Sequence, residues 1–450
     1  MVFSSIIFLF AFLPLFLLCY FLPKKIKTKN IVLTLFSLMF YAWGEPYYIL
    51  LMILMILVNY KLTIKMDEKK SKKILIFLII FNLFSLFSFK YANFCINNLN
   101  SIFKLHISNL KLSLPIGISF YTFQILSYVI DVYKEKVNSQ KSLINLACYI
   151  SAFPQLIAGP IVRYVDIEKE ITNRKTTSSD FADGIRRFIV GLSKKVLIAN
   201  NVSYICDAIF ASGIQSAGFI GILIATIAYT LQIYFDFSGY SDMAIGLGRM
   251  CGFHYSENFN KPYTSKTVTE FWSRWHISLS TFFKDYVYIP LGGNRCSKKK
   301  HIRNLLIVWA LTGLWHGDSW NFIIWGLYYG IVLIIEKYCL KDKKISSHIY
   351  TMLVVMIGWL IFRQTNFNDL LLSFKALFGL YGLGSLKHLY YLGIFSSRYI
   401  ISFILGIIII TDLFKVKNDY AKDIFLIMIF FLSIVFIVVS SYNPFIYFRF

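Results

Sequence analysis

The chain has 450 residues, of which 57% are hydrophobic, 18% aromatic and only 15% charged. This apolar share is well above that of a water-soluble globular chain, so it excludes an ordinary soluble enzyme and indicates a membrane protein. The formal net charge is +23. The basic residues lie mainly in loops between apolar runs, which is typical of cytoplasmic loops that face anionic lipid, and no polar domain offers a surface for nucleic acid.

The seven cysteines are scattered along the chain and form no CxxC pair. This pattern predicts neither a disulfide framework nor a metal site.

The first apolar run, Val2–Leu22, lacks a preceding basic segment and a following cleavage signal, which predicts a retained span. The lysine-rich loop Pro23–Lys29 places that side in the cytoplasm and the N-terminus outside. Ile31–Trp43 and Tyr47–Val58 are the next apolar stretches, and Gly44–Pro46 is expected to form the turn between them.

Further along, Pro154, Gly159 and Pro160 interrupt the apolar run 149–160. This pattern predicts either a broken segment at membrane depth, covered by protein or a water-filled cavity, or an ordinary loop at the interface. Residues 188–205 are amphipathic, which favours an interfacial helix.

A strong span at Gly218–Tyr234 runs into the polar stretch Asp236–Asp242. The two carboxylates that bound this stretch are unsuited to lipid, so they line a cavity or bind a neighbouring helix. Counting the later apolar runs, we predict an all-α, polytopic membrane protein of about eleven spans, each needing roughly 20 residues.

The region 271–321 contains two Trp-His pairs, Trp275-His276 and Trp315-His316. Histidine is the side chain best suited to moving a proton near neutral pH, and an ionisable group at membrane depth is costly. His316 lies at a polar break between apolar runs, so it is interpreted as a general base or as part of a simple turn. His276 is interpreted as its partner or as a structural histidine. The segment Thr269–His276 is expected to be helical, with Glu270 and Arg274 paired.

A base must reach the proton it takes, and burial lowers the pKa of a histidine and keeps it neutral. A neutral imidazole can deprotonate a sugar hydroxyl as it attacks a thioester. No GxSxG nucleophile motif is present, which favours direct transfer over an acyl-enzyme. The basic cluster from Arg295 to Arg303 is either a lipid-anchoring loop or a landing site for an anionic donor.

Several long motifs resemble the membrane-bound O-acyltransferase (MBOAT) family, specifically its alginate O-acetyltransferase-like bacterial branch. These motifs are LPIGISFYTFQILSYVIDVY at 114–133, FPQLIAGPIVRY at 153–164, GLSKKVLIANN at 191–201, YFDFSGYSDMAIGLG at 234–248, NFNKPYTSKTVTEFWSRWHISLSTFFKDYVYIPLGGNR at 258–295, LTGLWHGDSWNFIIWGLYYG at 311–330 and NPFIYFRF at 443–450. One local departure is His254, where a basic residue is more usual.

The resemblance implies that His316 is the catalytic histidine and that His276 is a second active-site residue. It implies helices around a thin central core with a tunnel, with N-terminal helices at 1–110, the catalytic core at 111–340 and C-terminal helices at 341–450 in one integral unit. Candidate donor- or substrate-binding residues are Trp315, Asp318, Asn321, Arg274, Asn294, Arg295, Asp236 and Asp242, and no metal is expected.

The implied reaction moves an acetyl group from a cytoplasmic thioester, acetyl-CoA or an acyl-carrier protein, toward hydroxyls of an extracytoplasmic polysaccharide. The protein would lie in a bacterial cell membrane, bind no resident cofactor and work with a separate extracytoplasmic esterase-like partner. Two alternatives stay open. The group moved is D-alanyl or another acyl group on a cell-wall polymer, or the protein exports a glycan or lipid intermediate, although no internal repeat supports transport.

Overall fold

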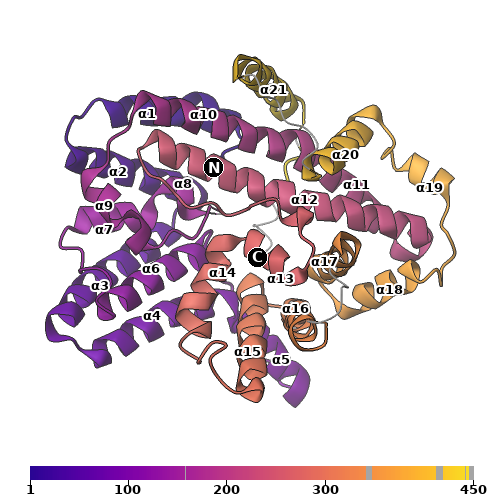
Figure 1. The fold of residues 1–450 in the computed structure, drawn as a ribbon, viewed down its shortest axis with the longest axis horizontal. Coiled ribbons are helices and arrows are strands. Elements are labelled where there is room, and N and C mark those ends of the chain that lie inside the picture. Colours follow the sequence, from indigo (N-terminus) through magenta and orange to yellow (C-terminus); the bar gives the residue numbers. More distant parts are fainter. Residues whose placement is uncertain (158, 341–346, 412–418, 441, 445–450) are drawn as a thin grey trace. The chain divides into compact units, whose positions relative to one another are not determined.

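The computed structural model describes residues 1–157, 159–340, 347–411, 419–440 and 442–444. Within these ranges the regular structure is helical, which confirms the all-α prediction (Figure 1). The chain separates into two compact units, one formed by residues 1–188 and 241–257 and the other by residues 189–240 and 258–450. The three-part division at residues 110 and 340 stays a prediction, because it follows motifs rather than compactness.

Unit 1 contains most of the N-terminal helices. Its elements are a π-helical turn at Phe8–Phe12, α1 Leu13–Phe21, α2 Ile26–Gly44, α3 Tyr48–Lys69, α4 Lys72–Lys90, α5 Ala92–Phe103, α6 Ile118–Tyr133, α7 Leu143–Ser151, α8 Phe153–Leu156, α9 Tyr164–Asn173 and most of α10 Ser178–Ser193. Helix α2 packs on α7, and α4 packs on α6. The turn expected at Gly44–Pro46 is confirmed, since α2 ends at Gly44 and α3 begins at Tyr48.

The interruption expected between residues 149 and 160 is confirmed as a break between α7 and α8. Ser37 on α2 accepts a hydrogen bond of 2.9 Å from the backbone N–H of Phe153, and Tyr149 donates to the carbonyl of Val162 at 3.0 Å. Phe153, Pro154 and Gln155 are buried. The protein therefore supplies the partners that the broken backbone needs. Ala158 lies outside the described residues.

Unit 2 contains the histidine motifs. Its elements are a π-helical turn at Lys194–Ala199, α11 Asn200–Ala211, α12 Ile214–Met250 (whose residues from Ser241 belong to unit 1), a 3₁₀ turn at Pro262–Thr264, α13 Val268–Arg274, α14 Ile277–Phe283, a π-helical turn at Lys284–Tyr288, α15 Lys298–His316, α16 Trp320–Tyr338, α17 His348–Arg363, α18 Phe367–Leu377, α19 Leu386–Tyr391, α20 Ser397–Ile410 and α21 Asp419–Val439. The amphipathic stretch expected as one helix at 188–205 is divided among the end of α10, the π-helical turn and the start of α11.

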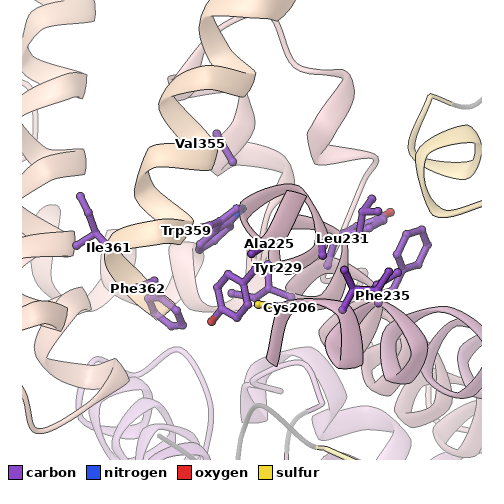
Figure 2. Close-up of a cluster of buried hydrophobic side chains, with 14 of the residues drawn as sticks. Cys206, Ala225, Tyr229, Leu231, Phe235, Val355, Trp359, Ile361 and Phe362 are labelled. Atoms are coloured by element: carbon purple, nitrogen blue, oxygen red, sulfur yellow. The ribbon is translucent and has the colours of Figure 1, made fainter. Parts of the chain in front are cut away.

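A buried aromatic and aliphatic cluster joins α11, α12 and α17 in unit 2. Figure 2 shows Trp359 and Phe362 on α17 beside Tyr229 of α12. Trp359 donates a hydrogen bond of 3.0 Å to the hydroxyl of Tyr263, which donates to the carbonyl of Thr230 on α12 at 2.6 Å. Because these hydrogen bonds join α17, Tyr263 and α12, this part of the cluster is a fixed wall for the neighbouring α13.

Helices α15 and α16 approach so closely that only glycine fits at their contact. A Cβ atom added at Gly313 would lie 2.2 Å from the carbonyl oxygen of Phe322, and one added at Gly326 would lie 2.2 Å from that of Trp309. Small residues at a helix contact allow such close approach in membrane proteins. The contact holds the last turn of α15, which carries His316, against the first turns of α16.

Among the residues that the structure describes, four helices are long and apolar enough to cross a membrane by length and composition: α3, α4, α12 and the part of α21 from Tyr420. The same part of the chain has three shorter apolar helices, at Phe8–Phe21, His348–Arg363 and Ser397–Ile410. These helices agree with a membrane protein. The count of about eleven spans is not confirmed and stays a prediction.

Candidate active site

The site begins with a break in the helix that carries the first Trp-His pair. Helix α13 ends at Arg274, two residues before the expected end, and α14 starts at Ile277. Between them His276 adopts the left-handed conformation, with φ of 45° and ψ of 54°. This conformation costs a non-glycine residue of order 1–3 kcal/mol and persists where the surroundings enforce it. The pair expected on α13 is confirmed, since Arg274 lies 2.7 Å from Glu270.

The irregular segment of residues 258–260 holds this conformation in place. The backbone N–H of Ile277 donates to the carbonyl of Asn258 at 2.9 Å, and the backbone N–H of Asn260 donates to the carbonyl of Arg274 at 2.9 Å. Both ends of the break are thus hydrogen-bonded to one segment. Such bonds compensate backbone groups that the helix break leaves without helical partners.

The second Trp-His pair lies at the end of a helix, as the polar break in the sequence predicts. His316 is the last residue of α15, Gly317 is extended, and α16 begins at Trp320. The side chain of His316 is 8% exposed. Its ring centroid lies 5.0 Å from that of Trp325 and 5.1 Å from that of Phe362, both edge-on. Aromatic rings therefore hold the imidazole on two sides.

Both histidines line one cavity of about 190 Å³ in unit 2. Its walls come from α13, α14, the π-helical turn Lys284–Tyr288 and α15. The lining residues are Trp272, Trp275, His276, Leu279, Ser280, Phe283, Lys284, Tyr288, Leu305, Val308, Trp309, Thr312 and His316. A mainly apolar cavity with a few converging polar groups is the usual form of a small-molecule site. The two histidines, forty positions apart in the sequence, thus belong to one site.

The imidazole of His276 is held among rings and is 1% exposed. Its centroid lies 4.6 Å from that of Phe237 and 5.9 Å from that of Trp315. The residue lies outside the helices that could cross a membrane. Burial lowers its pKa from 6.5 to about 3, because the charged form loses its hydration. His276 is therefore neutral near pH 7.

Ser280, Thr312, Lys284 and Tyr288 also contribute polar groups to the cavity wall. A buried histidine that the sequence analysis missed supports Tyr288. The hydroxyl of Tyr288 lies 2.8 Å from Nε2 of His301, and Nδ1 of His301 lies 2.7 Å from the hydroxyl of Tyr338. His301 is 2% exposed. The available signal was a histidine inside a run of lysines and arginines, because histidine is buried more often than either of those residues.

Two carboxylates named as candidate binding residues are paired with basic side chains instead of lining this cavity. Asp236 lies 2.7 Å from Nζ of Lys195, and both side chains are almost fully buried. Asp242, in unit 1, lies 2.6 Å from Arg187, which also pairs with Glu257 at 2.6 Å. Of the two roles that the sequence left open, the structure shows helix-to-helix contacts for both.

The remaining candidates divide into neighbours of the site and surface residues. Trp315 is buried, and its ring lies 4.9 Å from that of His316. Asn321 donates to the carbonyl of Gln364 at 2.7 Å. Asp318, Asn294 and Arg295 are exposed. None of these, nor Arg274, is among the cavity-lining residues.

The model of the membrane-bound O-acyltransferase family matches residues 9–344. The chain is 42% identical to a probable alginate O-acetylase, AlgI, of Azotobacter vinelandii, over 84% of this chain and 78% of that protein. It is 37% identical to a peptidoglycan O-acetyltransferase of Helicobacter pylori, over 86% and 82%. It is 32% identical to a teichoic acid D-alanyltransferase of Bacillus subtilis, over 54% and 65%. The chain belongs to the membrane-bound O-acyltransferase family.

Proposed function

We propose that this O-acyltransferase moves an acetyl group from a cytoplasmic thioester to hydroxyls of an extracytoplasmic polysaccharide. The observation that carries the proposal is the pair of buried histidines on one aromatic-walled cavity. His316 is the general base, and His276 supports the acceptor. Relatives named for acetyl transfer match more of the chain, at higher identity, than the relative named for D-alanyl transfer, which supports acetyl as the acyl group.

The reaction transfers one proton from the acceptor hydroxyl to His316 and then from His316 to the leaving thiolate. His316 takes the proton of the acceptor hydroxyl as its oxygen attacks the thioester carbonyl, forming the new C–O bond. When the C–S bond breaks, His316 returns the proton to the leaving thiolate. A positioned base of this kind contributes about 10²–10⁴-fold to rate. The apolar walls around Trp272, Trp275 and Trp309 limit water, which would otherwise hydrolyse the thioester.

The donor is expected to be coenzyme A or a phosphopantetheine carrier protein. Both carry phosphate, and the exposed basic residues Arg295 and Lys298–Lys300, the last three in the first turn of α15, offer charge to attract them. The same proposal places the protein in a bacterial cell membrane with its N-terminus outside, and gives it a separate extracytoplasmic esterase-like partner. The donor is a substrate, so no resident cofactor is required.

The test uses purified protein in lipid nanodiscs with acetyl-CoA or an acetylated carrier protein and a soluble glycan acceptor. His316→Ala should lower acetyl transfer by about 10²–10⁴-fold while the protein still inserts in membranes. His106→Ala is the matched control, because His106 is exposed and outside the cavity. Retained transfer in the His316 variant would remove that residue from the mechanism.

The same assay separates the rival functions. An acyltransferase consumes the thioester, whereas a glycan transporter leaves it intact. Mass spectrometry of the cell-surface polymer, from cells with and without the gene, distinguishes acetyl from D-alanyl or longer acyl groups.

A further inference from the structure

Asn258 makes an unusual set of contacts beside the candidate catalytic pair. It is fully buried, at 0% exposure. Its side-chain oxygen Oδ1 lies 3.1 Å from Nδ1 of His276, 3.2 Å from the backbone nitrogen of Ser278 and 2.9 Å from the hydroxyl of Ser278. Three groups therefore converge on one amide oxygen, directly after the helix break.

These contacts determine which way the amide group of Asn258 points. The backbone N–H of Ser278 can only donate, so the atom facing it must be an acceptor. This excludes the flipped orientation, in which the NH₂ group of Asn258 would face that N–H. Oδ1 is therefore correctly placed toward His276.

The orientation of Asn258 in turn determines where His276 carries its proton. An amide oxygen only accepts, so Nδ1 of His276 must donate to it. A neutral imidazole has one N–H, which leaves Nε2 with a lone pair. Burial keeps His276 neutral near pH 7, because it lowers the pKa of the ring to about 3.

This lone pair belongs to a residue of the cavity wall. Nε2 of His276 is buried and has no hydrogen-bond partner among the residues that the structure describes. His276 lines the cavity that also receives His316. A buried polar atom without a partner calls for an explanation, and one explanation is that a ligand group binds to it.

We propose that Asn258 is a positioning residue that holds His276 in the Nδ1–H tautomer, so that Nε2 accepts a hydrogen bond from a hydroxyl of the sugar acceptor adjacent to the reacting one, whose single proton goes to His316. The inference rests on the proposed acyl transfer. A thioester carbonyl only accepts hydrogen bonds, whereas a sugar hydroxyl donates, so the acceptor and not the donor is complementary to Nε2. His276 then orients the acceptor sugar and does not stabilise the oxyanion.

The tautomer can be measured without any assay of activity. Protein with ¹⁵N-labelled histidine is compared with a His276→Gln variant, which assigns the resonances of His276 by their loss. The two-bond nitrogen–proton correlations should show a neutral ring protonated on Nδ1 at pH 7. A neutral ring protonated on Nε2, or a charged ring, would overturn the proposal whether or not the protein transfers acetyl.

Kinetics of Asn258 variants provide the second readout. Asn258→Asp keeps the shape and the acceptor oxygen but adds a negative charge, which raises the pKa of His276. Below that raised pKa, Nε2 carries a proton and can no longer accept, so kcat/KM should fall as pH decreases from 8 to 6, with wild-type rate approached at pH 8. Asn258→Leu should lose about 10²-fold at every pH, because the ring is no longer oriented.

Two features keep this test specific. The matched control is Asn260→Asp, because the Asn260 side chain is exposed and only its backbone meets Arg274. The other titratable groups on the cavity are His316, Lys284 and Tyr288. They are the same in wild type, in Asn258→Asp and in the Asn260→Asp control. Superimposable pH profiles for Asn258→Asp and wild type would overturn the proposal, and thermal unfolding in detergent checks that each variant is folded. If the wild-type protein showed the tautomer but no transfer, the proposed function would fail and only the Asn258–His276 pairing would stand.

Discussion

Replacement of Gly313 by alanine should separate the position of His316 from the stability of the fold. Gly313 is three residues before His316 on α15, and its added Cβ would lie 2.2 Å from the carbonyl oxygen of Phe322 on α16. An ordinary contact is at least 3.4 Å, so backbone must move by about 1.2 Å. The obstacle is backbone, which cannot rotate away as a side-chain tip can.

The expected change in stability is small because two effects oppose each other. Overpacking costs about 1–3 kcal/mol, and replacing glycine by alanine inside a helix returns about 1 kcal/mol. The net free energy of unfolding should therefore fall by about 0–2 kcal/mol. A displacement of about 1 Å in a catalytic group can cost roughly 10²-fold in rate, so activity should fall far more than stability.

Acetyl transfer in nanodiscs and thermal unfolding in detergent measure the two quantities on the same sample. Gly44→Ala is the matched control: Gly44 ends α2, and the nearest atoms to its added Cβ lie 3.7 and 3.8 Å away. It should keep full activity. If Gly313→Ala kept wild-type kcat with a well-folded protein, close contact between α15 and α16 would have no part in placing His316.

Two further outcomes concern charge. Asp236→Asn should destabilise the protein by about 3–5 kcal/mol, because it leaves Lys195 buried without its counter-charge. A Lys195→Met/Asp236→Leu double variant should recover much of this stability in thermal unfolding. An unchanged unfolding midpoint for Asp236→Asn would contradict the pairing. For His254, burial alone would lower the pKa, but hydrogen bonds to Glu170 at 2.8 Å and Asp180 at 3.4 Å raise it above 6.5. Its stabilising contribution is then present below pH 6.5 and is lost as pH rises through the raised pKa. Unfolding midpoints should fall over this window in wild type and less in His254→Ala; identical slopes would contradict it.

Local features of the fold could be predicted from the sequence because their causes are local. Gly44–Pro46 ends one helix and precedes another, since a proline cannot continue the hydrogen-bonding of a helix interior. The end of α15 at His316 follows from the polar break and Gly317. The Glu270–Arg274 pair follows from the spacing of four residues on a helix.

Features that depend on partners far along the chain could not be predicted in this way. The sequence shows that Asp236 is costly in lipid, but not that Lys195 pairs with it. The break at His276 is also hidden, because Phe271–His276 has helical periodicity and the competing hydrogen bonds come from Asn258 and Asn260. Asn258 therefore gave no signal by itself: an asparagine between Glu257 and Phe259 has no spacing rule that relates it to a histidine eighteen residues later.

The two histidines also differ in the helix ends that they occupy, and this difference favours a division of labour. His316 is the last residue of α15, where the carbonyl groups give the helix end a partial negative charge that stabilises an imidazolium. His276 precedes the first turn of α14, where the N–H groups give a partial positive charge that opposes one. A proton taken from the hydroxyl is therefore better held on His316, whereas His276 stays neutral and accepting. One environment favours the protonated, charged imidazole and the other opposes it. This difference is the physical basis for assigning His316 as the base and His276 as a hydrogen-bonding partner.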